Sequence, residues 1–212
     1  MKHCLRLLWI RHGETEANRL KQYCGHWDLP LNDRGRSQLR ETAQRVRGLD
    51  VDRIYASDLQ RCRETAELLR KAWPKADVHC TADLRELSFG EWEGLTYDVI
   101  RNINPERLCR WLDHPRQVAP PGGETLDELE TRLSQWLEKV IDYHPGETIA
   151  VVTHGGPIRC FLSQYVDKDL GSFWKRPLPP GGWIAVEGTA KGWSVQKLGE
   201  KRGVGVWERT KY

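Results

Sequence analysis

The chain has 212 residues, enough for one domain, and its hydrophobic share of 39% is enough for a sizeable buried core. No apolar run approaches the roughly 18 residues that a membrane span requires, so the sequence predicts no integral membrane protein. The apolar stretch before Arg11 is too short for a signal peptide, and we expect a cytoplasmic protein.

The charge and cysteine patterns remove two further classes of protein. With 33 basic and 30 acidic residues the net charge is only +3, and the two signs are interleaved along the chain. A nucleic-acid-binding protein usually carries a basic block or face, so we expect no nucleic-acid partner. The six cysteines are widely spaced and form no CxxC pair, which favours reduced thiols and argues against a zinc site.

Strand-like and helix-like segments alternate along the chain. The expected strands cover residues 5–10, 51–56, 78–80, 148–153, 182–187 and 194–198. The expected helices cover residues 34–48, from Ser57 or Asp58 as N-cap to about Lys71, 124–143 and 157–166. Glu124 is expected to open its helix, where a negative charge favours the positive end of the helix dipole.

This alternation predicts an α/β fold with three layers, α/β/α, in which helices flank a mostly parallel central sheet. We expect a single domain over residues 1–212. The irregular stretch at about residues 96–123, which ends in two prolines and two glycines, is expected to form a small lid-like insertion. In such sheets ligands bind beyond the carboxyl ends of the strands, so the functional site is expected there.

Two of the expected strands end in the same way, with a histidine followed by glycine. The first runs into His12 and Gly13, and the strand at 148–153 runs into His154 and Gly155. A single strand-end histidine is more often structural, but two of them on neighbouring parallel strands would place both imidazoles in one crevice. The glycines would let a ligand approach the backbone.

Two arginines complete this pattern. Arg11 directly precedes His12, and Arg61 lies near the start of the second expected helix. A guanidinium offers bidentate donors to a tetrahedral phosphate, where lysine offers only a point charge. Most arginines of the chain are expected on solvated faces, and Arg11 is the exception because it adjoins a strand-end histidine.

Blocks of sequence around these residues resemble one known family. The first includes Arg11, His12, Gly13 and Glu14, and the others lie at residues 25–35, 56–66, 84–94, 121–125 and 152–156. Together they are similar to the histidine phosphatase superfamily, in its phosphoglycerate-mutase-like branch.

The resemblance implies metal-independent hydrolysis of a small phosphomonoester through a phosphohistidine. His12 would attack phosphorus as a neutral imidazole. Arg11, Arg61 and His154 would hold the phosphoryl oxygens as charge spreads in the transition state. Glu86 would protonate the leaving group and then help to activate water.

The resemblance also suggests further substrate contacts at Asn18, Cys24, Gly25 and Gly155. It implies neither a metal nor another cofactor, because the cationic side chains take the part that magnesium plays elsewhere. We expect a monomer or a homodimer.

Glu86 and the remaining histidines have competing interpretations. A surface ion pair is the ordinary one for a glutamate beside Arg85, but the spacing of Glu86 to Gly90 and Gly94 favours the catalytic role. Four other histidines are expected in loops, at strand ends or on the surface. They are His26, His79, His114 and His144, and His26 lies nearest to the expected entrance loop.

The resemblance covers both mutases and phosphatases. Tyr97 stands where cofactor-dependent phosphoglycerate mutases carry a lysine after the catalytic glutamate, and residues 101–123 contain no Arg-Arg pair. These departures favour a phosphatase. A non-catalytic phospho-ligand binder would normally have lost one of the reactive side chains, all of which are present.

Among phosphatases, the chain is most similar to α-ribazole phosphatases, which dephosphorylate α-ribazole 5′-phosphate in cobalamin nucleotide-loop assembly. Phe89, Trp92, Trp111 and the proline-rich turn would then line a pocket for a benzimidazole ring, or instead form only a packed lid core. Broad-specificity and sugar-phosphate phosphatases and a phosphoglycerate mutase remain alternatives.

Overall fold

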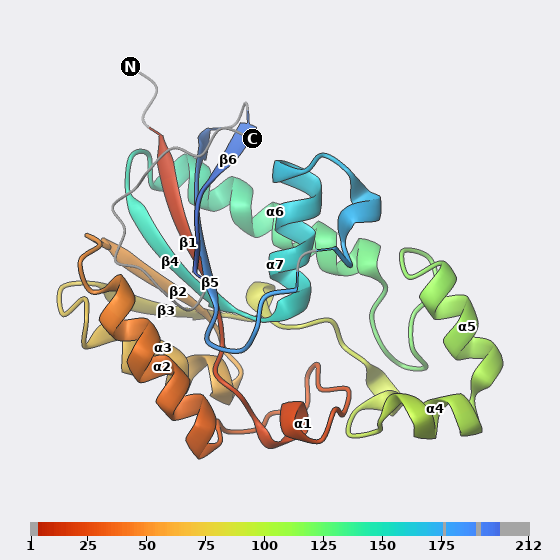
Figure 1. Cartoon of the computed structure of the whole chain (residues 1–212). Coiled ribbons are helices and arrows are strands. Elements are labelled where there is room, and N and C mark those ends of the chain that lie inside the picture. The colour runs from red at the N-terminus through yellow and green to blue at the C-terminus, as the bar shows by residue number, and fades with distance from the viewer. Residues whose placement is uncertain (1–3, 176, 190–191, 200–212) are drawn as a thin grey trace.

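A six-stranded sheet forms the centre of the molecule, in the order β3-β2-β4-β1-β5-β6. The computed structural model describes residues 4–175, 177–189 and 192–199 (Figure 1). The strands are β1 (Leu5–Arg11), β2 (Arg53–Ser57), β3 (Asp77–Thr81), β4 (Thr148–Thr153), β5 (Trp183–Thr189) and β6 (Gly192–Gly199). β5 pairs antiparallel with β1 and with β6, and the other three strand pairs are parallel, so the expected mostly parallel sheet is confirmed.

Helices cover both faces of this sheet. They are α1 (Glu16–Arg19), α2 (Asp33–Val46), α3 (Gln60–Arg70), α4 (Tyr97–Ile103), α5 (Pro105–Asp113), α6 (Leu126–Tyr143) and α7 (Gly155–Phe161). α2 and α3 lie on one face and α6 and α7 on the other (Figure 1). None of the helices in the described ranges is long and apolar enough to cross a membrane.

Alternation along β1 builds two cores from one strand. Leu8 and Ile10 pack with the α2–α3 layer, whereas Leu7 and Trp9 point to the α6–α7 layer. The Trp9 ring lies 4.7 Å from that of Phe161 on α7. The expected three-layer α/β/α fold is therefore confirmed.

Several expected boundaries are wrong for identifiable reasons. α3 begins at Gln60 with Leu59 as its N-cap, so neither Ser57 nor Asp58 caps it. Arg85 instead binds the Asp58 carboxylate through two nitrogens, at 2.7 and 2.6 Å. The Gln60 N–H donates to Asp28 Oδ1 at 2.5 Å, so the cap comes from a distant loop.

The long helix starts later than expected. Thr125 caps α6 and forms a capping box with Glu128, so Glu124 lies before the helix. The helix expected at 157–166 begins at Gly155 and continues as a π-helical turn over Leu162–Val166. The segment between β1 and α2, where no helix or strand was expected, contains the short helix α1.

The stretch at about residues 96–123 carries α4 and α5. α4 lies next to the segment that holds α1, and α5 lies on the far side of α4 (Figure 1). Two expectations stay proposals: that this segment acts as a lid, and that residues 1–212 form a single domain.

Candidate active site

His12 and His154, the two strand-end histidines, lie side by side at the carboxyl ends of β1 and β4, as expected. β1 and β4 are parallel neighbours with Arg11 opposite Thr153, so His12 and His154 leave the sheet side by side. Their ring centroids are 5.1 Å apart, and both side chains are buried. The prediction that both imidazoles share one crevice is confirmed.

His12 is held in one tautomer. Its Nδ1 lies 2.7 Å from the Gly13 carbonyl oxygen. A carbonyl can only accept, so Nδ1 carries the proton and Nε2 keeps its lone pair. Burial, followed by the charges of Arg61 and Arg11, lowers the pKa of His12 well below 6.5. The ring is therefore a neutral base at pH 7, the state that a nucleophile requires.

His154 has both ring nitrogens engaged with protein groups. Arg61 Nε donates to Nδ1 at 3.2 Å, so the imidazole proton lies on Nε2, 3.0 Å from Ser57 Oγ. Burial and the Arg61 charge also lower the pKa of His154 well below 6.5. In this arrangement His154 orients Arg61, and a direct contact of His154 with phosphoryl oxygens stays a prediction.

Arg61 ties the loop after α1 to the core. Its guanidinium is buried and donates to the carbonyls of Gly25 at 2.6 Å and Trp27 at 2.9 Å. A guanidinium has more N–H donors than these contacts use, so Arg61 can still donate to a ligand. Gly25 must be glycine, because a Cβ there would lie 2.0 Å from the Leu87 carbonyl oxygen.

Arg11 keeps an unused donor. Its Nη1 donates to the Leu178 carbonyl at 2.6 Å, whereas its buried Nε has no hydrogen-bond partner. Burial lowers the pKa of Arg11, and the nearby Glu86 carboxylate opposes that effect. A Cβ at Gly155 would lie 3.6 Å from Arg11 Cζ, which places this guanidinium at the start of α7. A buried cation with an unmet N–H suits an anionic ligand.

The Glu86 carboxylate is fixed by backbone amides. Its two oxygens accept the Gly156 N–H at 3.0 and 3.1 Å, and Oε1 also accepts the Leu87 N–H at 2.9 Å. A Cβ on Gly156 would lie 2.0 Å from Glu86 Oε1. Only glycine at this position of α7 therefore leaves room for the carboxylate.

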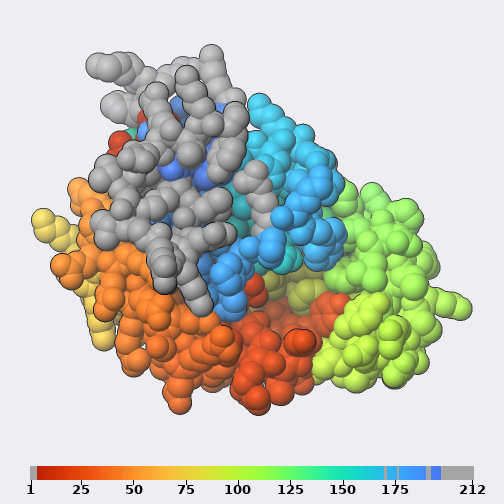
Figure 2. Space-filling model, viewed as in Figure 1, coloured from red at the N-terminus to blue at the C-terminus, as the bar shows by residue number. Residues whose placement is uncertain are grey.

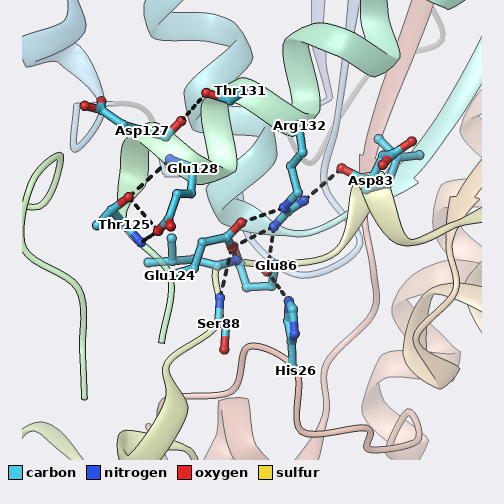
Figure 3. Close-up of polar contacts among 12 residues, drawn as sticks. His26, Asp83, Glu86, Ser88, Glu124, Thr125, Asp127, Glu128, Thr131 and Arg132 are labelled. Atoms are coloured by element: carbon cyan, nitrogen blue, oxygen red, sulfur yellow. Dashed lines mark hydrogen bonds and ion pairs between the residues drawn. The ribbon is translucent and has the colours of Figure 1, made fainter. Parts of the chain in front are cut away.

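A partly buried ion pair supports the Glu86 backbone (Figure 3). Arg132 on α6 binds both oxygens of Glu124, at 2.8 and 3.0 Å. The same guanidinium donates to the carbonyls of Asp83 and Glu86, at 2.8 and 2.9 Å. This pair, which sequence reasoning did not find, explains why Glu124 does not serve as the start of α6.

Sequence reasoning also assigned His26 only to a surface loop. His26 Nε2 lies 3.1 Å from the Glu86 carbonyl oxygen, so the exposed ring donates to the backbone of the candidate acid (Figure 3). The Glu93 carboxylate accepts the N–H groups of Gly25 and His26, both at 2.8 Å, and thereby fixes this loop. The presence of Glu93 in the block at 84–94, which resembles the family, could have indicated that this glutamate has a role in the site.

The other expected contact residues have local partners. Asn18 Oδ1 accepts from the Thr15 N–H and hydroxyl, both at 3.1 Å, in the capping box of α1. Cys24 Sγ lies 3.5 Å from the Trp27 carbonyl, and burial raises the pKa of its thiol to about 11. Substrate contacts by Asn18, Cys24, Gly25 and Gly155 stay predictions.

Beside Glu86 lies an aromatic cavity of about 250 Å³. Tyr23, Phe89 and Trp111 line it, and Glu86 and Gly156 form part of its wall. In Figure 2 the surface is hollowed between the red N-terminal segment, the green α4–α5 segment and the blue segment after α7. The cavity therefore opens from the carboxylate towards solvent.

The two interpretations of the aromatic residues each hold for some of them. Phe89 and Trp111 contribute to the cavity, but Trp92 is buried and packs edge-on against Trp111 at 5.6 Å. The proline-rich turn does not line the cavity, where Pro115 takes part instead. Among the residues that the structure describes, no three His, Cys, Asp or Glu side chains gather as a metal site. Metal independence stays a prediction.

A family model, the histidine phosphatase superfamily (branch 1), matches residues 7–201. The chain belongs to this superfamily. Phosphoglycerate mutase-like protein 4 of Arabidopsis thaliana is 40% identical over 71% of this chain and 66% of its own length, so the chain spans about two thirds of that relative. Phosphoserine phosphatase 1 of Hydrogenobacter thermophilus is 32% identical, with 80% of each protein covered.

Solved structures agree with this membership. The crystal structure of the α-ribazole phosphatase from Shigella flexneri superposes with a TM-score of 0.86, at 27% identity, over 95% of this chain and 98% of that one. The resemblance inferred from the sequence blocks is therefore confirmed for the superfamily and its fold.

The lowered pKa of His12 gives a pH prediction. NMR of the imidazole carbons should find His12 unprotonated as the pH falls from 7.5 through 6.5, because burial and two guanidinium charges oppose the imidazolium. The same histidine in the urea-unfolded chain should titrate near its ordinary value, about 6.5.

The lowered pKa of His12 also predicts how the stability of the protein depends on pH. Below about pH 6.5 the unfolded chain binds more protons than the folded chain, so the free energy of unfolding should fall as the pH falls through that range. A folded-state His12 that titrates at or above 6.5 would contradict this account of the site.

Proposed function

We propose that this chain is a phosphomonoester hydrolase that works through a phosphohistidine on His12. One observation carries the proposal: Glu86 borders the aromatic cavity and also lies close to Arg11, the residue before His12. With phosphate at the histidine, the leaving group would lie in the cavity, and its bridging oxygen would lie beside a carboxyl group that can protonate it.

The reaction then has two balanced steps. His12 Nε2 attacks phosphorus, the bond to the leaving oxygen breaks, and Glu86 gives that oxygen a proton. Water then attacks the phosphohistidine, the P–N bond breaks, and Glu86 takes the proton from water. Arg11 and Arg61 would hold the phosphoryl oxygens through both steps, since both guanidinium groups retain unused donors.

The substrate we propose is α-ribazole 5′-phosphate. The cavity has aromatic walls in Tyr23, Phe89 and Trp111, which suit a flat benzimidazole ring. A second cavity of about 410 Å³ shares Phe173 and Trp174 with it, which adds room for a leaving group of nucleoside size. The solved structure from Shigella flexneri, named for this activity, has the same fold.

Two alternatives have support of their own. Phosphoserine is a candidate because the relative from Hydrogenobacter thermophilus carries that name and because Arg159, a cation, lines the cavity. A mutase is favoured by the name of the Arabidopsis relative and disfavoured by Tyr97, which is exposed on α4. A non-catalytic binder would not require a carboxylate held as Glu86 is.

A substrate panel tests the proposed activity. In EDTA, we expect kcat/KM for α-ribazole 5′-phosphate to exceed that for phosphoserine, sugar phosphates and p-nitrophenyl phosphate by at least about tenfold, a margin that one good contact supplies. A flat profile would indicate a broad-specificity phosphatase. Exchange between 2- and 3-phosphoglycerate without phosphate release would indicate a mutase.

The Gly156→Ala variant tests the placement of Glu86. The new methyl group would displace a flexible carboxylate rather than the backbone, so the protein should fold but lose about 10²–10⁴-fold in kcat on α-ribazole 5′-phosphate. The loss should be smaller for p-nitrophenyl phosphate, whose leaving group needs little protonation.

Gly48→Ala is the matched control, because a Cβ there meets nothing within 4 Å. If Gly156→Ala lost the same factor on both substrates, Glu86 would not be the general acid.

A further inference from the structure

Arg159 is a partly buried cation that has no role in the proposed reaction. It lies on α7 and lines the aromatic cavity together with Glu86 and Gly156. Its guanidinium lies over two rings, 5.7 Å from the centroid of Trp174 and 5.9 Å from that of Phe173. These contacts fix the plane of the group and leave its edge for hydrogen bonds.

The guanidinium edge has no protein acceptor. Arg159 Nε is enclosed without a hydrogen-bond partner, and no carboxylate in the described ranges pairs with the group. The two terminal nitrogens also lack a described acceptor but, unlike Nε, are not enclosed. Because an enclosed N–H without an acceptor is costly, an acceptor from a ligand would complete the hydrogen bonding of this guanidinium.

Helix geometry places this edge next to the phosphate site. Arg159 follows Gly155 by four residues and Gly156 by three, so all three share one face of α7. Gly155 adjoins Arg11, and Gly156 holds Glu86. Arg159 is close enough to Arg11 for its charge to lower the pKa of that group. The backbone of Arg159 therefore lies about one helical turn beyond the two glycines that border Arg11 and Glu86.

We propose that Arg159 is the specificity residue of this site, and that it donates hydrogen bonds to an oxygen acceptor on the leaving alcohol a few bonds from the ester oxygen. A ribose hydroxyl supplies that acceptor in α-ribazole 5′-phosphate, and a carboxylate supplies it in phosphoserine. The inference rests on the proposed phosphatase activity but not on which of these alcohols is the substrate.

The position of the two rings supports this role over a purely structural one. Trp174 is 51% exposed, and Phe173 and Trp174 also border the second cavity. An arginine that only stabilised the fold would be expected to have a carboxylate or carbonyl partner, as Arg132 does with Glu124. The rings instead hold the guanidinium at the surface that a leaving group would cover.

The test compares Arg159→Met with wild type on three substrates: α-ribazole 5′-phosphate, phosphoserine, and phenyl phosphate, whose leaving group has no second oxygen. We expect kcat/KM to fall by about tenfold to hundredfold for whichever oxygen-bearing substrate the wild type prefers, as for a lost hydrogen bond to a charged group. Phenyl phosphate should change by less than about threefold, within the weak effects expected when no hydrogen bond is lost.

Two further variants make the result specific. Arg159→Lys keeps the charge but loses the planar fork, and should fall between wild type and Arg159→Met. Arg110→Met, which removes an exposed arginine of α5, should leave all three rates unchanged. Thermal unfolding of each variant establishes that it is folded.

The outcomes separate this inference from the proposed substrate. Equal losses on all three substrates, or no loss on any, would overturn the role of Arg159. An enzyme that prefers phosphoserine and loses that preference in Arg159→Met would refute the α-ribazole proposal and support the role of Arg159. A preference for α-ribazole 5′-phosphate that is lost in the same variant would support both.

Discussion

Two imidazoles and two guanidinium groups share a largely buried space at the carboxyl ends of β1 and β4, and the chemistry of the site depends on that crowding. Desolvation and the positive charges of Arg61 and Arg11 both oppose protonation of His12 and His154. The imidazoles therefore stay neutral while the guanidinium groups supply the positive charge. The site therefore combines guanidinium charge, which attracts a phosphate dianion, with a neutral imidazole that keeps a lone pair.

Glu86 is positioned mainly by hydrogen bonds from backbone N–H groups. The Glu86 carboxylate accepts backbone N–H groups from Gly156 on α7 and from the next residue, Leu87. The Arg132–Glu124 pair fixes the backbone carbonyls of Asp83 and Glu86. The Glu86 carboxylate would not fit in this position with a larger residue at Gly156. The position of the carboxylate is thus set by main-chain geometry. This geometry keeps one carboxyl group close to Arg11 and at the wall of the aromatic cavity.

The sequence predicted those parts of the site that are local. β4 was expected at its observed bounds because its four central residues are apolar and its two threonines are β-branched, and the two His-Gly strand ends located the crevice. The α3 cap was missed because the acceptor, Asp28, lies 32 residues away. The sequence left open whether Trp92 lines the cavity or packs in the core, because a tryptophan between glycines does not reveal which side of a loop it faces.

Long-range partners were the main omission. Arg132 and Glu124 are eight residues apart in sequence and are joined only because the chain before α6 folds back over its first turns. Arg159 was not singled out, since its significance depends on Phe173 and Trp174, which reach it through an irregular segment. In both cases the residue type was visible, but the partner was set by tertiary packing.

The most direct test of the account is to trap the covalent intermediate. The enzyme would be mixed with excess substrate in EDTA, quenched in alkali within one turnover, digested, and analysed by mass spectrometry. The account predicts an acid-labile, alkali-stable phosphoryl group on the peptide that contains His12, and neither this group nor turnover in His12→Ala. Phosphate bound to another residue, or normal turnover in His12→Ala, would contradict it.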